Sequence, residues 1–234
     1  YAVFKNKKFF FMIDLGKAPD KKFSKDYQAG LFSFEFDYLG EKVITNSGYF
    51  QNNQHQLNNI SKSTATHSTL VLDNTSNVKF ERDKYGHMLV SKNFKILNKE
   101  VKSERNFWEI IASHDAYSKS YGVIHERQIK FYFENNKLSG CDKLIKTKRF
   151  KVCNFAIRFH LLPEIKLTKL LNHETILIEN KNSGWKFTCK NHKIDIETGL
   201  YFGMKNKYTE NKNILITGLT NSVDENILWE ISKV

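Results

Sequence analysis

The chain has 234 residues, with 37 lysines and arginines against 25 acidic residues, which gives a formal charge of +12. Hydrophobic residues make up 40% of it and aromatic residues 14%, enough to fill a packed core, and this excludes wholesale disorder. No run of about 18 apolar residues occurs, so no membrane-spanning helix is expected. A pI near 9.4 favours an acidic partner, although codon bias toward lysine, asparagine and isoleucine produces the same charge.

Apolar and polar residues alternate with a period of two from the first residues onward. In segment 31–39, Phe34 and Phe36 fall on one face and Glu35 on the other, as a half-buried strand requires. The alternation recurs at 129–134, 185–190 and 194–197. Segment 106–112 fits one helical turn or a strand, and we expect a strand.

Turn signals rich in glycine and asparagine separate these strands at intervals of roughly 8–12 residues. The chain contains two prolines, no repeat of fixed period and no linker-like segment. The pattern predicts an all-β fold, a large antiparallel β-sandwich of many short strands, in a single domain over residues 1–234. The polar stretch 51–66 lacks apolar periodicity and is predicted to be a long loop.

Two pairs of basic or imidazole side chains share faces of predicted strands. His125 lies two residues before Arg127, and Arg158 two residues before His160. An arginine fork and an imidazole suit the binding of carboxylates or sulfates. A hydrogen-bonded, partly buried histidine explains each of these positions equally well.

A metal site requires two or three such side chains to converge from separate strands. His67 and His114, with Asp83 or Asp73 as the carboxylate, have suitable ligand chemistry, although their spacing alone does not establish a site. The three cysteines are widely spaced, which predicts neither a disulfide framework nor a cysteine zinc site.

Several ordered blocks of sequence carry a family resemblance. They lie at 61–73, 112–117, 122–127 and 155–160, with further fits at 13–19 and 215–218. From about residue 10 to residue 229 the chain resembles the C-terminal β-sheet domain of the heparinase II/III-like family of bacterial polysaccharide lyases. The resemblance implies an N-terminal (α/α) toroid domain, absent from this chain, with the substrate in the cleft between the two. A strand pattern follows Tyr1 at once, without a signal peptide, so we expect a segment of a longer chain.

The activity implied by the resemblance is β-elimination on an acidic polysaccharide that contains uronic acid. A base removes the C5 proton, a polar group neutralises the uronate carboxylate, and an acid protonates the leaving oxygen. In the family the tyrosine base belongs to the helical domain, so this chain is expected to be part of a carbon–oxygen lyase whose base lies elsewhere. From this chain we expect His67, His125 and Arg127 to serve catalysis, and Arg158 and His160 to bind substrate.

The resemblance also implies a structural zinc, with His67 and His114 as ligands and Asp83 as the first choice of carboxylate, ahead of Asp73. Two positions depart from the family pattern. Ala65 stands where some members have a catalytic histidine, and Leu162 replaces the second histidine of a later block. Either other groups perform the chemistry, or His67 takes the role in the cleft and no zinc binds.

Heparin-like and alginate-like glycans both fit this interpretation, as does a location in the bacterial periplasm or cell envelope. The alternative is a non-catalytic module of the envelope that binds anionic glycan through surface lysines. Nucleic-acid binding through the basic run 143–151 is disfavoured, since Phe150 is its one aromatic residue available for stacking.

Overall fold

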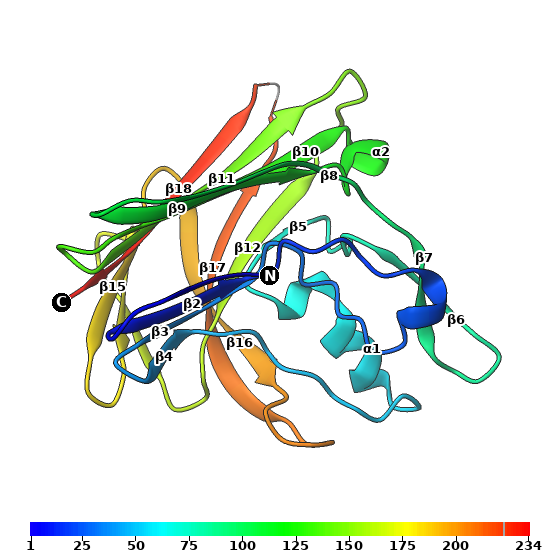
Figure 1. The fold of residues 1–234 in the computed structure, drawn as a ribbon, viewed down its shortest axis with the longest axis horizontal. Helices are drawn as coiled ribbons and strands as arrows, with labels where there is room; N and C mark the ends of the chain where they lie inside the picture. The colour runs from blue at the N-terminus through cyan, green and yellow to red at the C-terminus, as the bar shows by residue number, and fades with distance from the viewer. Residues whose placement is uncertain (222) are drawn as a thin grey trace.

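The structure, a computed structural model, describes residues 1–221 and 223–234 and consists mainly of antiparallel strands (Figure 1). A four-stranded sheet has the order β1-β2-β3-β4. Its strands are β1 (Ala2–Lys5), β2 (Phe9–Ile13), β3 (Phe34–Tyr38) and β4 (Glu41–Ile44). In β3, Phe34 and Phe36 are buried while Glu35 stays partly exposed, which confirms the alternation expected there.

The largest sheet has eight strands. In spatial order they are β13 (Lys166–Lys169), β14 (Thr175–Glu179), β15 (Gly184–Cys189), β18 (Glu225–Lys233), β11 (Lys137–Lys146), β10 (Val123–Tyr132), β9 (Phe107–His114) and β8 (Ile96–Ser103). Every pairing in it is antiparallel. The strand expected at 106–112 is confirmed as part of β9.

A second four-stranded sheet and a hairpin complete the strands. Their members are β16 (Lys193–Tyr201), β17 (Thr209–Leu219), β12 (Asn154–His160) and β5 (Leu70–Leu72) in the sheet, and β6 (Lys79–Arg82) and β7 (Met88–Lys92) in the hairpin. The predicted all-β sandwich is confirmed. That residues 1–234 form a single domain stays a prediction. Among the described residues, no helix is both long and apolar enough to span a membrane.

Aromatic side chains fill the space between the sheets. Phe11 packs on Trp108 with ring centroids 4.4 Å apart, and Phe34 stacks on Trp229 at 5.7 Å. Burying one such side chain contributes about 1.5–3 kcal/mol. A Cβ atom at Gly140 would lie 2.0 Å from Trp229, so the indole can lie against this strand because the residue is glycine.

The polar stretch 51–66 is not the long loop that its composition predicts. It contains α1 (Gln56–Lys62) and the 3₁₀ turn η2 (Thr64–Thr66), and Figure 1 shows α1 at the same end of the molecule as the β6–β7 hairpin. Asn58 is buried and donates to the Phe50 carbonyl at 2.6 Å. Polar side chains anchor this helix by hydrogen bonds, so an apolar stripe is not needed to hold it. The other short helices are α2 (Ser118–Tyr121) and the 3₁₀ turn η1 (Lys21–Phe23).

Candidate functional site

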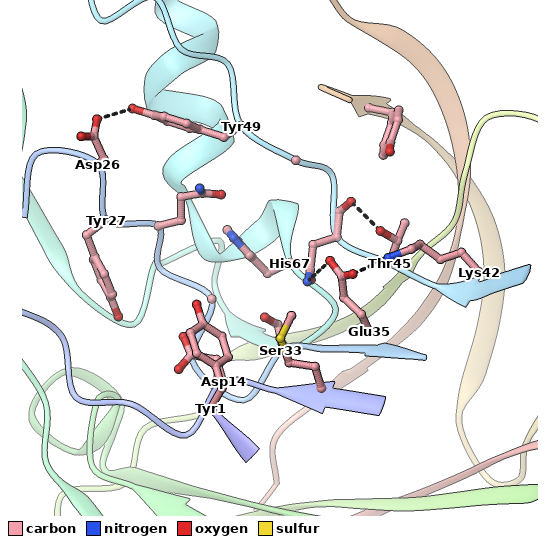
Figure 2. A pocket seen from close by; sticks show the side chains of 16 residues that line it. Tyr1, Asp14, Asp26, Tyr27, Ser33, Glu35, Lys42, Thr45, Tyr49 and His67 are labelled. Carbon is pink, nitrogen blue, oxygen red and sulfur yellow. Dashed lines mark hydrogen bonds and ion pairs between the residues drawn. The ribbon is translucent and has the colours of Figure 1, made fainter. Parts of the chain in front are cut away.

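A cavity of about 490 Å³ lies beside the four-stranded sheet β1–β4, next to the segment that carries α1 and η2 (Figure 2). Polar side chains dominate its lining. The ionisable ones are the carboxylates Asp14, Asp26 and Glu35, the tyrosines Tyr1, Tyr27, Tyr49 and Tyr201, and the basic side chains Lys42 and His67. His67, one of the histidines predicted to serve catalysis, is among these lining residues.

His67 reaches the cavity from the turn that follows η2. Its Nδ1 lies 2.9 Å from the carbonyl oxygen of Ser63, which only accepts hydrogen bonds, so Nδ1 carries the proton and Nε2 keeps its lone pair. The side chain is 5% exposed, and burial lowers its pKa to about 4. A Cβ atom at Gly30 would lie 2.7 Å from the His67 ring, so glycine permits the close approach there. His67 is therefore a neutral imidazole with an open acceptor nitrogen.

The carboxylates of the cavity differ in their partners. Glu35 forms an ion pair with Lys42, which also lies 3.7 Å from Asp37. Asp14 accepts the backbone N–H of Gly16 at 2.8 Å, and burial raises its pKa. Asp26 accepts from the Tyr49 hydroxyl at 3.4 Å, near the limit of a hydrogen bond. Among the described side chains, neither Asp14 nor Asp26 has an ion-pair partner at contact distance, although the charge of the N-terminal amine acts on Asp14 and that of Lys62 on Asp26.

Tyr27 also lines the cavity, and the charge of Asp14 acts on its hydroxyl. Its oxygen is buried and has no hydrogen-bond partner in the described part of the chain. Burial, followed by the charge of Asp14, raises the pKa of this hydroxyl. A buried hydroxyl without a partner is costly, and the oxygen of Tyr27 has almost no accessible surface, so a ligand in the cavity does not reach it in this conformation.

His160 does not line the cavity but supports the backbone behind it. Its Nε2 donates to the carbonyl of Ala65 at 3.1 Å, and its Nδ1 accepts from the Ser47 hydroxyl at 3.0 Å. The Ser47 backbone N–H in turn donates to the carbonyl of Thr66 at 2.9 Å. Burial lowers the pKa of His160 to about 3. Substrate binding by His160 stays a prediction, and in this structure its buried ring fixes the segment leading to His67.

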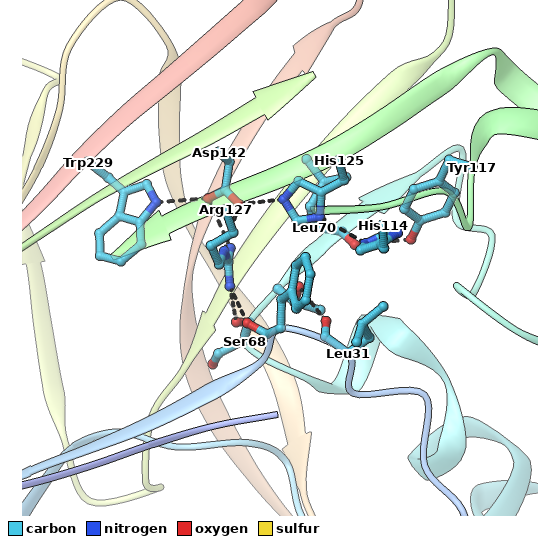
Figure 3. Close-up of polar contacts among 11 residues, drawn as sticks. Leu31, Ser68, Leu70, His114, Tyr117, His125, Arg127, Asp142 and Trp229 are labelled. Carbon is cyan, nitrogen blue, oxygen red and sulfur yellow. Dashed lines mark hydrogen bonds and ion pairs between the residues drawn. The ribbon is translucent and has the colours of Figure 1, made fainter. Parts of the chain in front are cut away.

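His125 and Arg127 lie in the core, in a hydrogen-bonded network (Figure 3). Arg127 donates from Nε and Nη2 to the two oxygens of Asp142, at 2.7 and 2.9 Å. His125 Nε2 donates to the same carboxylate at 2.7 Å, and Trp229 donates to it at 2.9 Å. Although burial alone raises the pKa of Asp142, the charge of Arg127 and the bond from His125 hold it well below its usual range. His125 and Arg127 are both buried within this network, and their part in catalysis stays a prediction.

His114 extends this network, and both of its ring nitrogens are engaged. Its Nδ1 accepts the backbone N–H of Ala116 at 3.2 Å, so its Nε2 carries the proton and donates to His125 Nδ1, also at 3.2 Å. A zinc ligand needs a free nitrogen lone pair, which His114 lacks in this arrangement.

The carboxylates expected to complete the zinc site lie elsewhere. Asp83 closes the β6–β7 turn, where it accepts from the backbone N–H of Tyr85 at 2.9 Å and of His87 at 2.8 Å. Asp73 accepts from Asn154 at 2.9 Å. Over residues 1–221 and 223–234, no group of three or more histidine, cysteine or acidic side chains is placed to hold a metal ion. The predicted set of His67, Asp83 and His114 does not fit a shared zinc.

Arg158 is likewise separate from the cavity. Its Nε donates to Glu197 of β16 at 2.6 Å, across the outer surface of the second four-stranded sheet. The structure therefore does not make Arg158 and His160 a joint binding site. Sequence reasoning missed Asp14, Tyr27 and Glu35. The one signal for Glu35 was its place on the polar face of segment 31–39.

The family comparison matches the chain over residues 1–230 to the model described as heparinase II/III-like, C-terminal. Heparan sulfate lyase HepC from Pedobacter heparinus is similar with a TM-score of 0.76 at 14% identity, over 96% of this chain and 33% of that one. A heparinase III is similar with a TM-score of 0.71 at 14% identity, over 97% and 33%. No curated protein sequence matches. The chain thus spans about a third of these solved relatives.

Proposed function

Because the chain belongs to the heparinase II/III-like C-terminal family, we propose that it forms one wall of the substrate cleft of a polysaccharide lyase. The reaction is β-elimination on a uronic-acid-containing polysaccharide, in the glycosaminoglycan-like or alginate-like class. A helical toroid domain of the same parent chain supplies the other wall and the base that removes the C5 proton. The proposed location of the protein is the bacterial periplasm or cell envelope, where it would encounter such a polysaccharide.

The observation that carries this proposal is the neutral imidazole of His67 at the cavity. Nδ1 is fixed by the Ser63 carbonyl, which leaves Nε2 to accept a hydrogen bond or a proton from a sugar unit. A pKa of about 4 makes His67 a weak base at neutral pH, since general bases work best when their pKa is near the operating pH. His67 therefore orients a substrate hydroxyl, and the C5 proton goes to a group of the other domain.

The remaining predicted residues support the wall from behind. His160 fixes the backbone at Ala65, and Arg127 donates to the carbonyls of Phe32 and Ser68 at 2.9 and 2.8 Å. These bonds tie the segments on both sides of the cavity to the sheet core. His125 acts through Asp142, which holds the Arg127 guanidinium in place.

The alternative is a non-catalytic module that holds anionic glycan. It requires cations that are free to meet sulfates or carboxylates, whereas the lysine of this cavity already pairs with Glu35. The observations therefore favour the role as a wall of the substrate cleft. The alternative role as a glycan-binding module depends on lysines elsewhere on the surface.

The test measures release of unsaturated uronate by the full-length parent protein from heparan sulfate, alginate and related polyuronates. We expect elimination on at least one polymer, and a fall of about 10–100-fold for His67→Ala, because one hydrogen bond worth about 1–3 kcal/mol is lost. His67→Gln retains an acceptor and should lose less, and His173→Asn, an exposed histidine, serves as the matched control. Release from no polymer, or full activity in His67→Ala, would refute the proposal.

A further inference from the structure

A second cavity, of about 310 Å³, lies at the open end of the β6–β7 hairpin, between that hairpin, the segment 75–78 and α2 (Figure 1). It shares no lining residue with the cavity beside His67. Lys79 of β6 and Lys92 of β7 line it, and none of its described lining residues is acidic. Its volume is at the lower end of the range for small-molecule sites, roughly 300–1,000 Å³. This cavity is therefore a separate, basic site.

The two lysines are cross-strand partners in an antiparallel pair. Lys79 lies opposite Lys92 in the register of the hairpin. Like charges placed directly opposite each other destabilise a pair of strands. Within the described part of the chain, Lys92 makes no hydrogen bond and no ion pair that would offset this repulsion. An anion held between the two ammonium groups would offset it.

The surface beside the hairpin adds to the positive charge. Segment 17–25 runs along β7, because the Ser24 hydroxyl accepts the Val90 N–H at 2.8 Å and the Asn93 amide donates to the Ala18 carbonyl at 3.0 Å. This segment carries four exposed lysines and one exposed aspartate. An approaching anion therefore meets a basic surface on this side of the cavity.

Two acidic side chains directly follow or precede lining residues in the chain, and both are engaged elsewhere. Glu81 lies between two lysines, 3.1 Å from Lys79 and 4.0 Å from Lys21. Asp115 accepts the backbone N–H of Lys95 at 2.6 Å. Since one carboxylate, that of Glu81, offsets the lysines of the hairpin and of segment 17–25, an excess of positive charge remains at the cavity.

The polar groups of the cavity that are free to meet a ligand are mainly donors. The Ser76 hydroxyl accepts the Thr64 N–H at 3.1 Å, which leaves its own hydrogen to donate. Ser120 is exposed at the rim, and each lysine ammonium brings three donors and no acceptor. The acceptor Oδ1 of Asn77 has almost no accessible surface, so it does not meet an occupant. A ligand with several acceptor oxygens matches this set of groups.

We propose that this cavity binds a tetrahedral oxyanion between Lys79 and Lys92, either a sulfate or phosphate ester group on a sugar or the free inorganic ion. The planar fork of arginine matches a planar carboxylate, whereas ammonium and hydroxyl donors that converge from several directions suit a tetrahedral group. No arginine is among the described lining residues. The cavity therefore prefers sulfate or phosphate to a uronate carboxylate. This site goes beyond the proposed function and does not depend on the lyase reaction.

The test titrates the isotope-labelled 234-residue chain with a sulfated glucose, a phosphorylated glucose, inorganic sulfate, glucuronate and glucose, at constant ionic strength, and follows the backbone amides by NMR. We expect saturable shifts at residues 75–79, 92–93 and 116–120 with the sulfated or phosphorylated ligands, and binding about tenfold weaker with glucuronate. Lys92→Gln should weaken binding about tenfold, because it removes a charge-assisted hydrogen bond. Lys99→Gln, at an exposed lysine of β8 that does not line the cavity, should leave binding unchanged.

The two sources of the oxyanion are separated by the same titration. Tighter binding of the sulfated or phosphorylated sugar than of inorganic sulfate would assign the site to an ester group, and the reverse order would assign it to the free ion. Glucuronate or plain glucose binding as tightly as the sulfated sugar would overturn the inference. So would unchanged binding in a chain that carries both Lys79→Gln and Lys92→Gln, or shifts spread evenly over all exposed lysines. Both lysines are exposed, so these variants keep the fold.

Discussion

The core network around Asp142 and the cavity around His67 contain similar side chains in opposite states. In the network, the carboxylate of Asp142 accepts four hydrogen bonds, and the imidazoles of His125 and His114 each use both nitrogens. In the cavity, His67 uses only Nδ1, and its Nε2 has no partner in the described chain. A polar group whose bonds are all made inside the protein stabilises the fold, whereas one left open is available to a ligand.

The largest expected effect comes from breaking the network. In Asp142→Ala the buried guanidinium of Arg127 loses its counter-charge, and we expect the free energy of unfolding to fall by about 3–5 kcal/mol. Urea denaturation measures this. Replacing both partners, as in Arg127→Met with Asp142→Leu, should recover much of the loss. A loss below about 1 kcal/mol in Asp142→Ala would show that the network is not fully desolvated.

The next effect depends on pH. His67 and His160 have pKa values of about 4 and about 3 in the folded chain, because burial disfavours the charged ring. The unfolded chain, with pKa values near 6.5, therefore binds more protons. The contribution of these two neutral rings to the free energy of unfolding is complete above about pH 6.5. It decreases as the pH falls toward the pKa values of the folded chain.

Between pH 8 and pH 5, we expect each of these two histidines to reduce the free energy of unfolding by about 2 kcal/mol. Denaturation curves across this range measure the slope, and His67→Gln should make it shallower. A curve that is flat between pH 8 and pH 5 would contradict the buried, neutral state of both rings.

A smaller effect should connect the two regions. His160→Gln loses the bond that fixes the Ala65 carbonyl, and we expect about 1–3 kcal/mol lower stability and about tenfold slower elimination by the parent protein. The distinguishing measurement is the pKa of His67 by NMR, which should rise toward 6.5 as its segment loosens. An unchanged His67 pKa would assign His160 a purely structural role.

The smallest effect is expected from metal removal. The sequence predicts zinc on His67, His114 and Asp83, but the hydrogen bonds of His114 leave it no lone pair to donate. We therefore expect a chelator to leave the melting temperature unchanged. Elemental analysis that finds about one zinc per chain, lost in both His67→Ala and His114→Ala, would reverse the hydrogen-bond directions assigned here.

Local patterns were sufficient for the strands. Alternation in segment 31–39 and the apolar run in β9 predicted strands correctly, because a half-buried strand imposes a period of two on its own sequence. The same reasoning failed for α1, where buried Asn58 bonds to the Phe50 carbonyl. A helix held by polar contacts to a distant segment leaves no apolar periodicity to recognise.

The sequence by itself determined the strand pattern, the all-β class and the family, since these depend on residue order and on ordered motifs. Only the tertiary structure decided which histidine meets a cavity and which is buried in the core. His67, His125 and His160 all lie at or beside strand patterns and share one chemistry. What separates them is the set of groups that folding brings to their ring nitrogens, and the most distant of these partners, Ser47 on His160, lies 113 residues away along the chain.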